Sequence, residues 1–182
     1  EMTATGVQWT FAPALSVTRD QRWGRAYESF GEDPALVTSM TTAVSGLQGG
    51  GLSLPDTVLA TAKHFAAHGT PEGGRNGAPG NYSEHVIREV FLPPFDAAVR
   101  EANVATVMAS YNEVDGIPAH ANRWLLTDVL RGESKFSGLV VSDYFGIAEL
   151  ERKHHVVATL PEAGRTALEA GVDVELPQFE GF

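Results

Sequence analysis

The sequence contains no cysteine, so disulfide bonds and thiolate chemistry are excluded. Basic residues are also scarce: 13 Lys and Arg stand against 23 Asp and Glu, which gives a formal net charge of -10. Because phosphate backbones are bound by clustered Lys and Arg, we expect no nucleic-acid partner. No stretch approaches the roughly 20 consecutive apolar residues of a membrane span, and the first residues show no basic start followed by an apolar run.

What the sequence does contain fits a globular α/β fold. Hydrophobic residues make up 43% of its 182 residues, enough to bury a core. Short apolar runs rich in β-branched residues predict strands over 7–15, 58–64, 104–110, 138–142 and 173–176. Most of these runs are nearly continuous rather than alternating, which is typical of strands buried on both faces of a parallel sheet.

Helical patterns lie between the predicted strands. The first covers 33–48, where Asp33 and Pro34 form a cap and first-turn pair. The second begins near Ser83 and is broken or kinked at Pro93 and Pro94. Two more cover 122–130 and 161–170. Strand and helix in alternation imply right-handed crossovers and a parallel sheet, either doubly wound or closed into a barrel.

Polar residues follow successive predicted strands, at the point where each apolar run ends. They are Lys63 and His64, residues 110–112, and Ser142 with Asp143. In a barrel all of these positions converge on the carboxyl-terminal face. A complete barrel needs about 250 residues, so five strands in 182 residues favour an incomplete (β/α)8 TIM-like barrel with at least its first strand missing.

Each of these polar residues has a structural alternative. Asp143 is either a carboxylate pointing into a cleft or the N-cap of a helix that begins near Phe145. Lys63 and His64 clamp sugar hydroxyl groups or hold a carboxylate ionised, or else they form a solvated strand end. Asn112 is alternatively part of the turn toward Asp115-Gly116.

The loop after the first strand carries Arg22, Trp23 and Arg25 close together. Fork-shaped guanidinium donors beside an aromatic ring suit sugar recognition, and the alternative is an internal ion-pair network with the acidic residues at 28, 32 and 33. His154 and His155 are adjacent and cannot share one helical face, so we expect a solvated turn or helix end and no metal site. The glycine clusters lack phosphate-loop spacing, and no cofactor is indicated.

Five ordered motifs run along nearly the whole chain. They are Phe11–Pro13 with Arg19–Arg25 and Glu28–Pro34; Ala62–Phe65; Met108–Asn112 with Asp115–Pro118; Asn122–Leu126 with Leu130-Arg131; and Gly138–Asp143. Together they resemble the N-terminal catalytic barrel domain of glycoside hydrolase family 3, which includes β-glucosidases and β-xylosidases.

The resemblance implies a retaining double displacement on a terminal, non-reducing sugar of an oligosaccharide or β-glycoside. Asp143 matches the nucleophile and Tyr111 the tyrosine near it. The residues that match sugar-binding positions are Arg25, Lys63, His64 and Arg75. Tyr144 stands where the family usually has tryptophan, which alters the aromatic wall beside the nucleophile, and Glu133–Ser137 replaces a Trp-Gly-Phe-Lys pattern. Only the resemblance suggests a location, periplasmic or secreted.

The resemblance also implies missing parts. A sugar-binding aspartate would lie before Glu1, and the general acid/base glutamate would lie in a following C-terminal domain of the same polypeptide. We therefore expect the isolated chain to be weakly active or inactive on unactivated glycosides, because leaving-group protonation contributes about 10²- to 10⁴-fold. Open sheet edges and exposed apolar surface predict marginal solubility.

Several functions remain open at this point. β-Glucosidase is the first expectation and β-xylosidase the second, because no residue decides whether the pocket accepts a hydroxymethyl group. The N-acetylglucosaminidase branch takes its acid/base from an Asp-x-His element, and residues 65–81 contain His68 but no aspartate. An alternative of another class is a non-catalytic sugar-binding barrel fragment.

Overall fold

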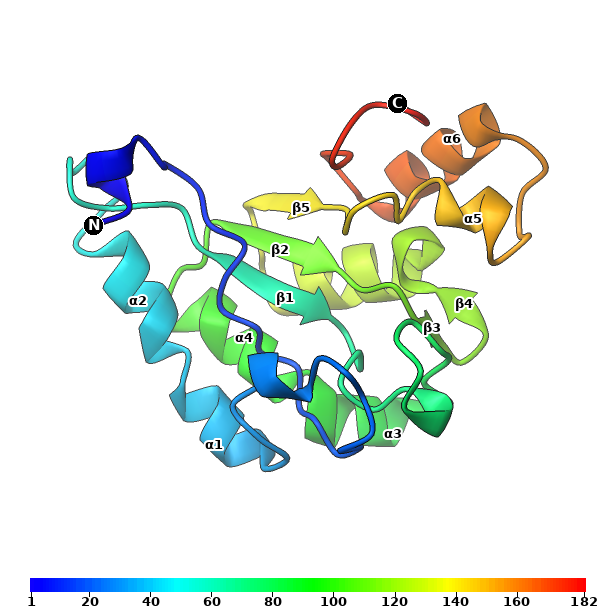
Figure 1. The fold of residues 1–182 in the computed structure, drawn as a ribbon, viewed down its shortest axis with the longest axis horizontal. Coiled ribbons are helices and arrows are strands. Elements are labelled where there is room, and N and C mark those ends of the chain that lie inside the picture. The colour runs from blue at the N-terminus through cyan, green and yellow to red at the C-terminus, as the bar shows by residue number, and fades with distance from the viewer.

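A computed structural model describes residues 1–182 as helices packed around a small parallel sheet (Figure 1). The strands are β1 (Thr61–Phe65), β2 (Thr106–Ala109), β3 (Glu113–Val114), β4 (Ile117–Pro118) and β5 (Leu139–Val141). The α-helices are α1 (Pro34–Ser39), α2 (Thr42–Gln48), α3 (Glu84–Val86), α4 (Pro93–Arg100), α5 (Glu149–Arg152) and α6 (Leu160–Ala170). π-Helical segments cover η4 (Ile87–Phe91) and η6 (Trp124–Glu133), and short 3₁₀ turns cover η1 (Thr3–Thr5), η2 (Ala26–Glu28), η3 (Glu72–Gly74) and η5 (Ala119–Ala121).

The central sheet has the order β1-β2-β5, and all its strands are parallel. The register pairs Thr61 with Thr106 and Val107 with Val140. All three strands point toward the same edge of the molecule, where the β3–β4 hairpin lies (Figure 1). The predicted parallel α/β arrangement is therefore confirmed.

The two outer predicted strands are reduced to isolated parallel bridges. Trp9 pairs with Leu59 and Ala14 with Lys63 on one side, and Val141 pairs with Val174 on the other. Pro13 offers no backbone donor to a ladder over 7–15. At 173–176 the side chain of Asp173 accepts the backbone N–H of Val140 at 2.6 Å, in place of a carbonyl from a paired strand.

The first predicted helix is interrupted between α1 and α2. Its middle carries a run of hydroxyl residues that bond back to the preceding turn: Thr38 donates to Pro34 O at 2.7 Å, and Thr41 donates to Thr38 O at 2.9 Å. Such bonds compete with the regular helical pattern and bend helices. The single helix predicted over 33–48 is therefore wrong, although Asp33 caps α1 as expected.

The other predicted helices are present with different bounds. η4 ends at Phe91 and α4 starts at Pro93, so the prolines interrupt the helix, and it restarts at once because proline is tolerated in a first turn. α6 begins after Thr159, whose side chain accepts from Glu162 N, and ends at Gly171 with a φ of 116°. α5 and the β3–β4 hairpin were not predicted.

The core lies between the sheet and the helices that cover it. Phe65 on β1 meets Phe95 on α4 edge to face at 5.0 Å between ring centroids, and both are buried. α1 packs against α4. No helix combines the length and the apolar content that a membrane crossing requires.

We expect Phe95→Ala to lower the free energy of unfolding by about 3–5 kcal/mol, because it empties a filled site against Phe65. Phe179 is 76% exposed, so Phe179→Ala should change stability by less than about 0.5 kcal/mol. Urea denaturation of both variants measures the difference. Equal losses would show that this contact does not belong to the cooperative core.

Candidate active site

The carboxyl ends of the three central strands bring most of the predicted residues together. Lys63 and His64 lie in β1, Tyr111 follows β2, and Asp143 follows β5. Arg25 joins them from the loop before η2. Parallel strands explain the convergence, because their carboxyl ends share one edge of the sheet.

Asp143 is 7% exposed and has two differently held oxygens. Its Oδ1 accepts a hydrogen bond from the backbone N–H of Tyr144 at 2.8 Å. Its Oδ2 is buried and accepts no hydrogen bond, although His64 Nε2 lies 3.6 Å away. The side chain does not cap a helix, because it binds the next residue and α5 begins only at Glu149; the N-cap alternative is therefore wrong.

Arg25 is the centre of the charged groups around Asp143. It makes a two-pronged ion pair with Glu28, with distances of 2.6 and 3.0 Å. Its remaining donors reach His64 Nε2 at 2.7 Å and His68 Nε2 at 3.3 Å. The sequence alternatives for Arg25 were sugar recognition and an internal ion pair, and the ion pair with Glu28 is present in the structure.

Lys63 and His64 are successive residues whose side chains both reach this cluster. In a regular strand they would point to opposite faces, but the β1–β2 register shifts between Ala62 and Phe65. Lys63 Nζ lies 3.8 Å from Glu28 Oε2, and His64 is fully buried beside Arg25. The alternative of a solvated strand end is therefore wrong.

Electrostatics within the cluster follow from burial and from the ion pair. Burial raises the pKa of Asp143 above its ordinary value, although the backbone hydrogen bond from Tyr144 and the nearby Tyr111, Arg25 and Lys63 oppose the change. Hydrogen bonding to Arg25 lowers the pKa of Glu28. Burial lowers the pKa of Lys63, and that of His64 well below its ordinary value. At neutral pH the imidazole of His64 is therefore uncharged, and it accepts from Arg25.

Tyr111 and Arg75 differ in how close they come to Asp143. The Tyr111 hydroxyl donates to the carbonyl of Tyr144 at 2.9 Å, and burial raises its pKa. Arg75 is exposed, and no hydrogen bond or ion pair joins it to the other candidates. It lines a separate surface cavity of about 310 Å³ together with Lys153, whose Nζ lies 5.9 Å from the Tyr111 ring centroid.

Two buried histidines at the site were not assigned roles from the sequence. His68 packs edge to face on Trp23 at 4.9 Å and contacts Arg25, and burial lowers its pKa to about 3. His120 accepts the backbone N–H of Asp143 at 3.0 Å. Neither lies at the end of a predicted strand, so strand position gave no signal for them.

The remaining sequence alternatives are resolved by contacts. Asn112 donates to the carbonyls of Ala66 and Glu113 and leads into the Asp115-Gly116 hairpin turn, as its structural alternative predicted. His154 lies just after α5 and pairs with Glu113 at 2.8 Å. No group of three or more histidine or acidic side chains is placed to hold a metal ion.

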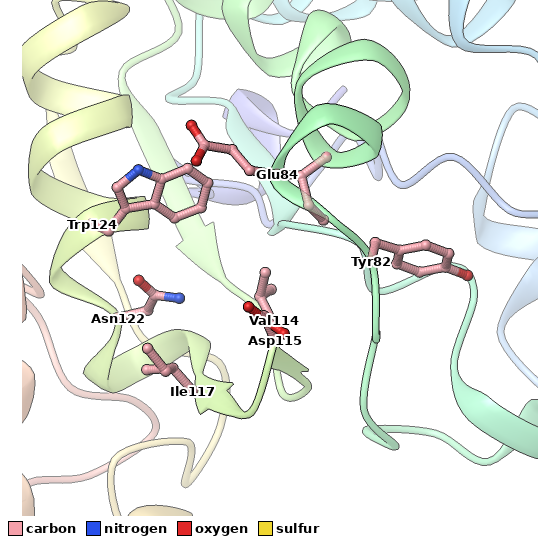
Figure 2. Close-up of a pocket in the computed structure, with 8 residues that line it drawn as sticks. Tyr82, Glu84, Val114, Asp115, Ile117, Asn122 and Trp124 are labelled. Atoms are coloured by element: carbon pink, nitrogen blue, oxygen red, sulfur yellow. The ribbon is translucent and has the colours of Figure 1, made fainter.

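A second cavity of about 220 Å³ lies beside the β3–β4 hairpin. Figure 2 shows Trp124, Asn122 and Ile117 on one side of it and Glu84 on α3 across from them. None of the candidate residues around Asp143 lines this cavity. The candidate active site is therefore not this cavity but the cluster formed by Asp143, Arg25, Glu28, Lys63 and His64.

Comparison with known proteins assigns the family. Residues 1–181 match the family described as Glycosyl hydrolase family 3 N terminal domain. The chain belongs to glycosyl hydrolase family 3. A β-xylosidase of Formosa agariphila is 45% identical over 180 residues, which are 97% of this chain and 25% of that protein. A periplasmic β-glucosidase of Salmonella typhimurium is 41% identical over 172 residues, covering 94% and 22% respectively.

Solved structures agree with this family 3 assignment. The β-glucosidase of Listeria innocua superposes with a TM-score of 0.91 at 41% identity, covering 96% of this chain and 24% of that one. The family 3 chain described here thus spans about a quarter of the length of the curated relatives it matches. The resemblance seen in the sequence motifs is confirmed.

We expect Glu28→Gln to lower the free energy of unfolding at pH 7 by about 2 kcal/mol, because it leaves Arg25 without its charged partner. The folded-state pKa of Glu28 is depressed, so its contribution is present above the unfolded value of about 4.3 and is lost as pH falls through the folded value. Urea denaturation at pH 7 and pH 3 should show that the difference in free energy of unfolding between the wild type and Glu28→Gln becomes smaller at low pH. Glu32→Gln, at an exposed and unpaired position, is the matched control. The same difference in free energy of unfolding at both pH values would contradict this account.

Proposed function

We propose that this chain forms part of the catalytic barrel of a retaining, exo-acting β-glycosidase that hydrolyses terminal, non-reducing β-D-glucosyl residues, with Asp143 as nucleophile. One observation carries the proposal. Oδ1 of Asp143 is fixed by Tyr144 N, whereas Oδ2 is buried without a hydrogen-bond donor. An unpartnered carboxylate oxygen beside cations is available to attack an electrophilic carbon.

The reaction begins when Asp143 attacks the anomeric carbon. The bond from that carbon to the leaving-group oxygen breaks as an ester bond to Asp143 forms, and the leaving oxygen takes a proton from a general acid. In the second step, the residue that acted as general acid now takes a proton from a water molecule. This water attacks the anomeric carbon, the ester bond breaks, and Asp143 is released as a carboxylate. Retention of configuration follows from the two displacements.

The neighbours of Asp143 suit the binding of a sugar. Arg25, Lys63 and His64 place polar groups around the carboxylate, and we assign them to the sugar hydroxyls. Tyr111 lies beside the nucleophile. We also assign Arg75 to sugar binding. Its side chain is exposed and would have to turn toward the site.

The general acid/base is assigned to a glutamate in a following C-terminal domain. Glu28 is the other carboxylate in the cluster, and it is held by Arg25 and Lys63, with a lowered pKa that keeps it ionised. A carboxylate in that state is a poor proton donor at neutral pH. The proposal therefore includes a division of the site between this domain and another part of the polypeptide.

The incomplete (β/α)8 barrel remains part of the proposal. Its support is the parallel order of β1, β2 and β5, the flanking bridges at Trp9 and Val174, and the gathering of polar residues at one edge. These features suit a segment of a larger barrel whose other strands complete the sheet.

β-Xylosidase is the second candidate. It is favoured by the 45% identity to the Formosa agariphila β-xylosidase, which exceeds the 41% identity to each of the two β-glucosidases named above. The two sugars differ by a hydroxymethyl group, so the discriminating property is the space at that position of the pocket.

The test is covalent trapping with 2-deoxy-2-fluoro glucosides and xylosides that bear an activated leaving group. We expect one sugar adduct on Asp143, mapped by peptide mass spectrometry, because an activated leaving group needs no general acid. Asp143→Ala should give none, whereas Asp56→Asn, at an exposed acid, should label normally. Faster labelling by the xyloside would favour the second candidate. Sugar binding without any adduct in a folded sample would favour a non-catalytic sugar-binding fragment.

The pH dependence of trapping tests the state of the nucleophile. Asp143 attacks only when ionised, and burial raises its pKa, so the trapping rate should fall on an acid limb centred above the ordinary value of about 3.9. Lys63 favours the ionised form, so Lys63→Met should move this limb to higher pH. A limb at or below the ordinary aspartate value, or one that does not move in Lys63→Met, would contradict this assignment.

A further inference from the structure

His120 lies directly behind the residue proposed as nucleophile. Its Nε2 accepts the backbone N–H of Asp143 at 3.0 Å, and the residue is 2% exposed. A ring nitrogen that accepts a hydrogen bond carries no proton, so the imidazole is neutral and its proton is on Nδ1. Burial favours the same state, since it lowers the pKa of His120 to about 3.

This hydrogen bond completes a set that fixes the whole Asp143 residue. His120 holds the backbone nitrogen, Gly146 N donates to the Asp143 carbonyl at 3.0 Å, and Tyr144 N holds Oδ1 at 2.8 Å. Every polar atom of Asp143 except Oδ2 is therefore engaged. Fixing the other atoms aims the one free oxygen.

The β3–β4 hairpin explains how His120 reaches this place. The hairpin turns at Asp115 and Gly116, with φ values of 51° and 77°, and returns the chain to Ala119, whose N–H donates to Asn112 O at 3.1 Å. Ala119 is completely buried, so the position of the next residue is set by packing. A hairpin outside the central sheet thus holds a side chain against the end of β5.

Gly146 is the matching residue on the nucleophile loop. A Cβ atom built on Gly146 would overlap Cε1 and Nε2 of the His120 ring. Its φ is not in the left-handed region, so close approach of the imidazole, and not backbone conformation, requires glycine here. His120 and Gly146 therefore depend on each other.

We propose that His120 is a positioning residue, which acts through the backbone of Asp143 to aim its free oxygen, and that Gly146 provides the space for the imidazole. This inference rests on the proposed function of Asp143 as nucleophile. The inference predicts an effect on the rate of the covalent step and little effect on sugar binding, because the His120 side chain hydrogen-bonds to Asp143 and to none of the candidate sugar-binding residues.

The test compares His120→Leu, which has no acceptor, with His120→Gln, whose Oε1 can replace Nε2. With the fluorinated glycoside, His120→Leu should form the covalent adduct about 10- to 100-fold more slowly, because a small misplacement of reacting groups lowers a rate by about this factor. The binding constant for the glycoside should not change. His120→Gln should recover most of the rate. Equal rates in the wild type and His120→Leu would overturn the proposal.

Gly146→Ala supplies a second, independent variant. It should slow trapping as His120→Leu does, whereas in a His120→Ser background, where the ring is gone, it should add little further loss. Gly46→Ala, at a helical glycine with open space around it, is the matched control. Additive losses in the double variant would overturn the pairing of His120 with Gly146.

Amide exchange separates this inference from the proposed function. The Asp143 N–H should exchange faster with deuterium in His120→Leu than in the wild type or His120→Gln, whether or not the site is active. Failure of the wild type to label at Asp143 would refute the nucleophile assignment. Unchanged exchange at Asp143 in a folded His120→Leu sample would refute the role of His120.

Discussion

The site depends on the ion pair between Arg25 and Glu28. Asp143, Arg25, Lys63 and Glu28 lie together at the end of the sheet with little access to water, and a buried charge is costly unless it is paired. Two cations and two carboxylates balance one another. Because Arg25 forms its two-pronged ion pair with Glu28, the Asp143 carboxylate lies near positive charge without being hydrogen-bonded by it.

This balance meets two requirements that the proposed role of Asp143 as nucleophile places on its carboxylate. A nucleophile must be ionised, which nearby cations favour, and it must keep a free lone pair, which direct hydrogen bonds would occupy. In the structure Arg25 donates to His64 and Glu28 and not to Asp143. Neutral His64 therefore lies between the guanidinium and the carboxylate, with its Nε2 2.7 Å from Arg25 and 3.6 Å from Asp143 Oδ2.

Backbone geometry does the rest of the positioning. The register shift in β1 brings Lys63 and His64 to the same cluster, and the β3–β4 hairpin carries His120 behind Asp143. These are irregular features at the end of a regular sheet. This arrangement is common in parallel α/β folds, where the strands form a rigid edge and the loops after them carry the functional side chains.

Much of this arrangement was predictable from the sequence. Apolar runs located the three central strands, and the polar residues at the ends of those runs located Lys63, His64, Tyr111 and Asp143 at one edge. The motifs identified the family, because their residue types and order are specific. The helix ends at Asp33 and Gly171 were also predictable, since capping is a local property of the chain.

Only the tertiary structure decided the rest. The split of the first helix and the loss of the strand at 173–176 arise from competing side-chain hydrogen bonds, and an apolar pattern does not contain their outcome. The contacts of His68 with Arg25 and of His120 with Asp143 join segments far apart in the chain. The sequence by itself determined which residues stand at the ends of strands, because strand patterns are local; only folding decided which of them touch, because contact depends on register, loop path and burial.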